Sequence, residues 1–185
     1  MNVLIIMFLF LGVFFDTFAL MIGQGSLMPK IKLRNILSYV FIFSMWQLVA
    51  VFVGNNLVRY IFEKLVTNSF KNENLLSGLI IIFLGILIII KSIDSIKFLE
   101  RRMDVIDFSN VRFLGLITSF DMFLISISLR LLNIDFNLIL FVSLITTLLS
   151  IIIGVFTGYK YGYELKTKFR FLSAIIFIVL GIIII

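Results

Sequence analysis

The chain alternates between long apolar runs and short segments that hold most of its charges. Six runs are roughly long enough to cross a bilayer, for which a helix needs about 20 apolar residues. They are Val3–Gly23, Ile36–Leu57, Leu75–Ile90, Phe113–Leu129, Phe136–Thr157 and Phe171–Ile185. Backbone groups in lipid need partners within their own segment, so each run is predicted to be a helix. The pattern therefore predicts an all-α integral membrane protein with six transmembrane helices.

The composition limits the chemistry that the chain can perform. Of its 185 residues, 62% are hydrophobic, and it contains neither cysteine nor histidine. A typical soluble domain is nearer half apolar, and the mean hydropathy here is +1.21. A metal site without imidazole or thiolate would use oxygen donors, which suit Mg, Ca or Mn better than zinc or copper. The same absence leaves few means of activating a nucleophile, so neither an enzyme activity nor a cofactor is expected.

The positive charges indicate which way the chain crosses the membrane. Twelve lysine and arginine residues fall in the first, third and fifth loops, and four lie on the opposite side. The positive-inside rule therefore places these three loops in the cytoplasm and both termini outside. Basic loops beside spans also account for the net charge of +6, so nucleic acid is not an expected partner. The twelve are Lys30, Lys32, Arg34, Lys91, Lys97, Arg101, Arg102, Arg112, Lys160, Lys166, Lys168 and Arg170.

Two aspartates interrupt apolar runs at corresponding places. Asp16 lies in the first run, within FFDTFALMIGQG, and Asp121 lies in the fourth, within TSFDMFLISISL. Glycines in the runs that follow match as well, and the offsets are 105 residues for the aspartates and then 100 and 96 residues for the two glycine pairs. The aligned pairs are Asp16 with Asp121, Gly54 with Gly154, and Gly85 with Gly181. Three matches in order, with a steadily shrinking offset, predict a three-helix repeat.

The odd number of spans in the repeat determines how its two copies are related. The second copy must enter the membrane from the opposite side, which gives two inverted three-helix repeats, a plan common among secondary transporters. We assign residues 1–91 to the first repeat, 92–112 to a cytoplasmic linker and 113–185 to the second repeat. Apolar residues recur at helical spacing in the linker, which is therefore either a helix on the membrane surface or a solvated connection.

The two aspartates are predicted to lie deep in the membrane and close to each other. A charge at the centre of a spanning helix costs about 2.5–3.5 kcal/mol, and two adjacent carboxylates repel each other. The predicted spans contain no lysine or arginine at that depth, so a dehydrated divalent cation or protons would have to compensate the pair. The alternative is that each aspartate only hydrogen-bonds a neighbouring helix. The symmetric placement of Asp16 and Asp121 favours a metal site.

Neutral oxygen donors accompany the aspartates in the predicted spans. Gln47 is the deepest amide, and Thr147 lies near its repeat counterpart, so both are predicted to complete the metal site. Four further hydroxyls are predicted to support a polar path: Thr17, Thr118, Thr146 and Ser150. Each hydroxyl has an alternative partner in the carbonyl groups of its own helix.

These motifs resemble those of the MntP-type manganese exporters, a family of small bacterial inner-membrane proteins with six spans and two related halves. TSFDMFLISISL is similar to the family's fourth-span motif, with Ser126 in place of a typical glycine. FSMWQLVAVFVG, which contains Gln47, is similar to a motif of the second span. FFDTFALMIGQG is similar to the first-span motif at Asp16, Phe18, Ala19, Gly23 and Gly25. The resemblance covers nearly all of the chain.

The resemblance implies a secondary exporter in the bacterial inner membrane. Its transported substrate would be a divalent metal ion, foremost Mn²⁺, with protons as a candidate coupling ion. Metal would bind between Asp16 and Asp121, and rocking of the two halves would expose it to the other side. Two alternatives stay open. One is an exporter of another divalent cation, and the other is a non-transporting scaffold of the same fold, such as the similar YtaF-type sporulation membrane proteins.

Overall fold

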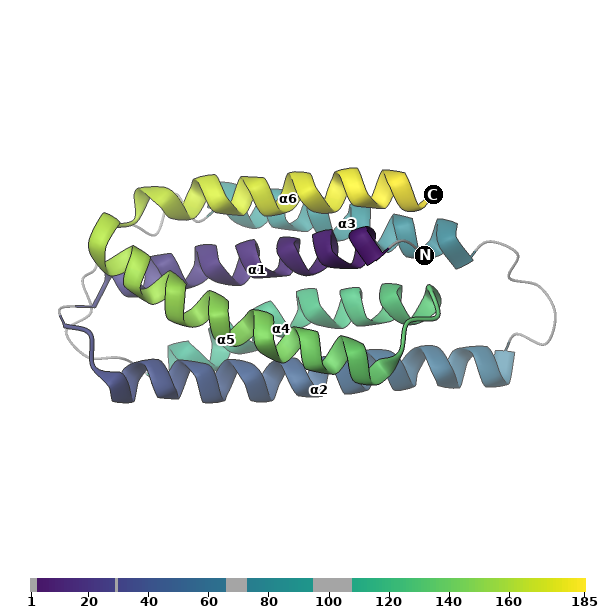
Figure 1. The fold of residues 1–185 in the computed structure, drawn as a ribbon, viewed down its shortest axis with the longest axis horizontal. Coiled ribbons are helices and arrows are strands. Elements are labelled where there is room, and N and C mark those ends of the chain that lie inside the picture. Colours follow the sequence, from purple (N-terminus) through teal and green to yellow (C-terminus); the bar gives the residue numbers. More distant parts are fainter. Residues whose placement is uncertain (1–2, 29, 66–72, 95–107) are drawn as a thin grey trace.

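Six helices make up the described part of a computed structural model, which comprises residues 3–28, 30–65, 73–94 and 108–185 (Figure 1). They are α1 (Val3–Ser26), α2 (Leu33–Leu65), α3 (Glu73–Asp94), α4 (Phe108–Leu131), α5 (Phe136–Tyr161) and α6 (Glu164–Ile184). Each contains a stretch that is long and apolar enough to cross a membrane. The predicted all-α membrane fold with six spans is therefore confirmed.

The two ends of the chain lie on the same side of the helix bundle. In Figure 1 the start of α1 and the end of α6 are both at the right, while the turn between α5 and α6 is at the far left. Six consecutive crossings require this arrangement, because each helix returns the chain to the opposite side.

Several helices continue beyond the spans predicted from hydropathy. α3 ends at Asp94 rather than at Ile90, and α6 begins at Glu164 rather than at Phe171. A charged residue ends an apolar run without ending a helix, because lysine, arginine and glutamate are good helix formers. The extensions place Lys91 and Arg170, which the sequence assigned to loops, inside α3 and α6.

The predicted linker is only partly within the described residues. Its two edges, 92–94 and 108–112, prolong α3 and α4. The prediction of a helix on the membrane surface concerns residues 95–107, which lie outside the described residues.

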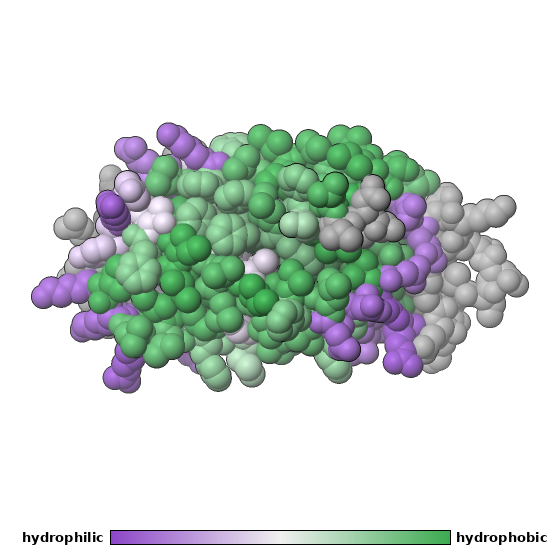
Figure 2. Space-filling view, viewed as in Figure 1, coloured by the Kyte–Doolittle hydropathy of each residue, from purple (hydrophilic) through white to green (hydrophobic). Residues whose placement is uncertain are grey.

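An apolar band surrounds the middle of the molecule. Figure 2 shows hydrophobic residues across the centre of this face and hydrophilic residues at both ends. Large apolar side chains in the helices face outward, among them Phe41, Phe141 and Ile182, which are 68%, 65% and 62% exposed. In water, such surface would cost about 25 cal/mol per Å², whereas lipid tails accept it.

The two helices that carry the aspartates form the centre of the bundle. In their apolar windows, 61% of α1 and 56% of α4 is buried, against 33–39% in the other four helices. α1 packs mainly against α5 and α6, and α4 packs mainly against α2 and α3. α3 also packs against α6, and α2 against α5. Exchanging α1 with α4, α2 with α5 and α3 with α6 leaves this set of contacts unchanged.

Glycines at repeat-related positions make matching close approaches. A Cβ on Gly54 would lie 2.9 Å from the carbonyl oxygen of Phe123, and one on Gly154 would lie 2.9 Å from that of Phe18. Phe18 and Phe123 are themselves aligned by the 105-residue offset between the aspartates. Small residues let helix backbones approach this closely in membranes. The paired approaches are those that an inverted repeat would produce, and the repeat itself stays a prediction.

Candidate metal site

Asp16 and Asp121 occupy the same position in their two central helices. Each is the fourteenth residue of a helix of 24 residues, counted from Val3 in α1 and from Phe108 in α4. At about 1.5 Å rise per residue, each lies roughly 20 Å from the start of its helix. Both residues are buried, with exposed fractions of 5% and 6%. As the sequence predicts, both carboxylates lie in the middle of long apolar helices and are buried.

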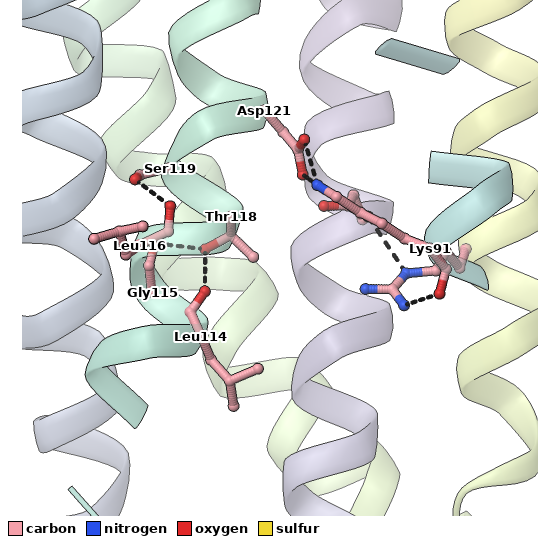
Figure 3. Close-up of polar contacts among 9 residues, drawn as sticks. Lys91, Leu114, Gly115, Leu116, Thr118, Ser119 and Asp121 are labelled. Carbon is pink, nitrogen blue, oxygen red and sulfur yellow. Dashed lines mark hydrogen bonds and ion pairs between the residues drawn. The ribbon is translucent and has the colours of Figure 1, made fainter. Parts of the chain in front are cut away.

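Asp121 accepts two short hydrogen bonds from a lysine of another helix. The ammonium nitrogen Nζ of Lys91 lies 2.7 Å from Oδ1 and 2.8 Å from Oδ2 of Asp121. Figure 3 shows the side chain of Lys91 extending from its helix to the carboxylate. The Lys91 side chain is 28% exposed and that of Asp121 is 8% exposed. The pair therefore joins α3 to α4 in a largely desolvated place, where charge-assisted hydrogen bonds are stronger than in water.

Asp16 faces an arginine of α6. Nε of Arg170 lies 3.7 Å from Oδ1 of Asp16, and both side chains are less than a tenth exposed. This distance is too long for a hydrogen bond, and Oδ1 of Asp16 is a buried acceptor with no hydrogen-bond donor within the described part of the chain. Nη1 of Arg170 donates to the backbone oxygen of Lys91 at 3.3 Å. Arg170 thus connects the two ion pairs, in the order Asp16, Arg170, Lys91, Asp121.

Aromatic packing holds Arg170 at the level of Asp16. The ring of Phe169, the residue before Arg170, stacks on Phe15 with 5.6 Å between centroids and meets Phe18 edge-on at 4.8 Å. One turn further along α6, Oγ of Ser173 donates to the backbone oxygen of Gly12 at 2.8 Å. These contacts fix the register of α6 against α1.

The expectation that no basic residue reaches the aspartates is wrong. Lys91 and Arg170 directly flank the predicted spans, because hydropathy alone placed the span boundary at the charged residue. In the structure they belong to helices whose spans include them, Glu73–Ser92 and Glu164–Ile184. A long side chain near a helix end can extend along the helix in either direction, and here both reach inward to a carboxylate.

A third cation lies at the same end of the bundle as Lys91 and Arg170. Lys166 stands one turn before Arg170 in α6, and its Cδ would be 3.0 Å from a Cβ on Gly23 of α1. Its Nζ donates to Oη of Tyr163 at 2.6 Å. Burial raises the pKa of the Tyr163 phenol, so the acceptor of this bond is a neutral hydroxyl and not a phenolate.

Gln47 and Thr147 contact each other. The hydroxyl of Thr147 lies within hydrogen-bond distance of the amide oxygen of Gln47 and of the backbone oxygen of Ser143. Gln47 is in α2 and Thr147 is in α5, and both are almost fully buried. The structure therefore brings this predicted pair together as a link between α2 and α5. Within the described residues, the two side chains bond to each other and, through Thr147, to Ser143, and neither side chain bonds to an aspartate.

Three of the four supporting hydroxyls donate to carbonyls of their own helices. Thr118 donates to the Gly115 oxygen at 3.0 Å (Figure 3), and Ser150 donates to the Thr147 oxygen at 3.0 Å. Thr146 donates to the oxygens of Val142 and Ser143, both at 2.9 Å. Thr17, the fourth, is buried beside Asp16. A hydroxyl that donates in this way keeps its oxygen lone pairs, so these groups remain capable of accepting a bond.

The site offers two carboxylates and a few neutral oxygens as ligands, which are donors of the kind that hard cations take. Among the described residues, no three acidic side chains gather in a group that could hold a metal. Asp16, Lys91 and Arg170 are the charged groups that act electrostatically on Asp121. A metal ion between the two aspartates would therefore need neutral oxygens as further ligands, and it would meet the two cations already there.

Comparisons with known proteins agree on one family. A family model described as "Putative manganese efflux pump" (Mntp) matches residues 30–185. A protein of Methanosphaera stadtmanae named "Putative manganese efflux pump MntP" is 28% identical over 167 residues, which cover 90% of this chain and 89% of that protein. A protein of Mannheimia succiniciproducens with the same name is 26% identical over 172 residues, or 92% of this chain and 89% of that protein. No solved structure matches the chain.

Proposed function

The chain belongs to the family described as "Putative manganese efflux pump", and from this membership and the buried aspartates we propose that it exports divalent metal ions, chiefly Mn²⁺. The relatives are named as efflux pumps. The observation that carries the proposal for this chain is the pair Asp16 and Asp121, each buried at the same position of a central helix.

In the proposed site, Mn²⁺ binds between the two carboxylates. Gln47 and Thr147 offer an amide oxygen and a hydroxyl oxygen, which can ligate without adding charge, from the two helices that pack outside α1 and α4. The hydroxyls of Thr17, Thr118, Thr146 and Ser150 line the approach. Oxygen donors of this kind are those that Mn²⁺ shares with Mg²⁺ and Ca²⁺.

The proposed mechanism is alternating access. Each half of the chain contributes one aspartate, so a rocking motion of one three-helix repeat against the other would expose the site to each side in turn. Export against an inside-negative potential requires a driving ion, because each charge moved across costs about 2.3 kcal/mol per 100 mV. Protons that enter from outside and protonate the aspartates would both release the metal and supply this energy.

The proposed orientation follows from the positive-inside rule. In the bacterial cell (inner) membrane, the α1–α2, α3–α4 and α5–α6 connections face the cytoplasm, and both termini face outward. Lys166, Arg170 and Lys91 then approach the site from the cytoplasmic end.

Flux into proteoliposomes tests the proposal. Purified protein would be reconstituted, and uptake of Mn, Cd, Co, Zn and Ca would be measured with and without a pH gradient. We expect Mn²⁺ flux that the gradient accelerates and that Asp16→Asn and Asp121→Asn each abolish, because one carboxylate alone cannot offset a dehydrated divalent ion. Asp135→Asn is the matched control, since it removes an exposed carboxylate at the start of α5.

Two outcomes would contradict the proposal. Absence of flux for every metal would favour a scaffold that does not transport. Wild-type flux in both aspartate variants would remove the carboxylate pair from the mechanism.

A further inference from the structure

The ammonium group of Lys91 occupies the place at Asp121 where a metal cation would bind. It lies within hydrogen-bond distance of both carboxylate oxygens, at 2.7 and 2.8 Å. A divalent ion bound to the same carboxylate would come within a few ångströms of this ammonium. Like charges at so short a distance repel each other strongly where solvent is largely excluded, and a divalent ion doubles the repulsion that a monovalent ion would experience. Lys91 and the metal therefore compete for Asp121.

The arrangement of the two cations is not a product of the repeat. Lys91 is near the C-terminal end of α3, which ends at Asp94, whereas Arg170 is near the N-terminal end of α6, which begins at Glu164. The aspartates are related by the predicted repeat, but their cations both come from one end of the bundle. Arg170 donates to the backbone oxygen of Lys91, so the two basic residues form one unit across α3 and α6.

We propose that Lys91 is a tethered counter-cation that neutralises Asp121 when no metal is bound and must leave it when Mn²⁺ binds. This inference rests on the proposed transport function. Since the metal must displace Lys91, the lysine lowers the affinity of the site for Mn²⁺. When the metal departs, the return of Lys91 to Asp121 favours release over rebinding. Lys91 thereby keeps the affinity for Mn²⁺ low enough for the metal to be released. It also excludes cations that bind carboxylates too weakly to displace the lysine.

Metal binding to purified protein tests the proposal without requiring transport. Titration calorimetry with MnCl₂ would compare the wild type with Lys91→Met and Lys91→Gln. We expect both variants to bind Mn²⁺ at least about tenfold more tightly, because the metal no longer has to break the charge-assisted hydrogen bonds from Lys91 to Asp121. Lys91→Arg restores the competing cation and should bind with nearly wild-type affinity. Lys168→Met is the matched control, because Lys168 is an exposed lysine of α6, and its removal should leave the affinity unchanged.

Transport kinetics provide a second test of the role of Lys91. In proteoliposomes, Lys91→Gln should lower KM for Mn²⁺ and also lower kcat, because metal enters readily and leaves slowly. A lysine that only held α3 to α4 would not produce this combination, since loss of packing lowers kcat without tightening the binding of metal.

The outcomes separate the two proposals. If the wild type binds and transports Mn²⁺ but the folded Lys91→Gln variant binds it with equal or lower affinity, the counter-cation role is wrong and the transport function stands. If the wild type neither binds nor transports Mn²⁺, the proposed function fails and the inference fails with it.

Discussion

The ion pair between Lys91 and Asp121 should be visible as a coupling energy in the stability of the protein. Removing either partner leaves the other as a charge in a largely buried place, which is costly. Removing both partners eliminates the uncompensated charge. We therefore expect Lys91→Met and Asp121→Asn each to destabilise the metal-free protein, and the double variant to be destabilised by much less than the sum of the two.

The structure sets the size of this coupling. Both contacts are short, 2.7 and 2.8 Å, and only the lysine is appreciably exposed, at 28% against 8% for Asp121. An exposed pair would contribute about 0–1 kcal/mol, and breaking a fully buried pair costs about 3–5 kcal/mol. The pair lies between these limits, so we expect a coupling of about 1.5–3 kcal/mol, as for a hydrogen bond to a charged group.

Thermal unfolding in detergent, with chelator present, measures the effect. The single tryptophan, Trp46 in α2, provides an intrinsic fluorescence signal. It lies against α4, where a Cβ on Gly115 would be 3.0 Å from Trp46 Cδ1, so it reports on the packing around the helix of Asp121. For a protein of this length, 1 kcal/mol shifts the unfolding midpoint by about 2–4 °C. Each single variant should therefore lower the midpoint by about 3–12 °C.

A control cycle with Lys168→Met and Asp121→Asn should be additive, because no ion pair joins these two residues. The reasoning is refuted if the Lys91 cycle is additive as well, within the roughly 0.5 kcal/mol expected for independent sites.

Three further predictions address packing, the neutral ligand and orientation. A Cβ on Gly158 would lie 2.1 Å from the backbone oxygen of Ile22, so Gly158→Ala should force α5 away from α1 and destabilise the protein by about 1–3 kcal/mol; an unchanged unfolding midpoint would contradict the close approach. Gln47→Leu should weaken Mn²⁺ binding, measured by calorimetry, by roughly the 1–3 kcal/mol expected when a buried polar partner is lost; unchanged affinity would assign Gln47 to helix packing alone. Because the chain has no cysteine, a single introduced cysteine is the only thiol that the purified chain can carry after labelling. An impermeant maleimide applied to intact cells should modify Asn133→Cys and should not modify Lys168→Cys, and the reverse result would invert the orientation.

Hydropathy predicted the fold because the membrane imposes a simple rule on the backbone. A segment in lipid must satisfy its own hydrogen bonds, so the six apolar runs had to be helices, and six helices are present in the described residues. The depth of Asp16 and Asp121 followed from the same rule, since a helix advances by a constant rise for each residue.

The partners of the aspartates could not be found in this way. Whether Lys91 and Arg170 point into the bundle or toward the lipid headgroups depends on how α3 and α6 pack, and that packing depends on small residues at contact positions. A Cβ on Gly85 would lie 3.1 Å from the backbone oxygen of Ala174, and one on Gly181 would lie 2.8 Å from that of Gly78. A hydropathy profile scores these glycines only for their polarity. It carries no information on how closely they allow α3 and α6 to approach each other. One signal was available in the sequence: each cation directly flanks an apolar run.

The charges at the site also explain how two deep aspartates are compatible with membrane insertion. Two carboxylates, one ammonium and one guanidinium form a neutral set contributed by α1, α3, α4 and α6, so the metal-free protein need not bury a net charge. The other two helices, α2 and α5, contribute the neutral contact between Gln47 and Thr147. A divalent ion that enters this set raises its charge by two unless cations withdraw or protons leave. Under the proposed function, metal binding would then be coupled to separation of α3 from α4 and of α6 from α1, since these helix pairs carry the two ion pairs. That relative movement between neighbouring helices is what alternating access requires of the bundle.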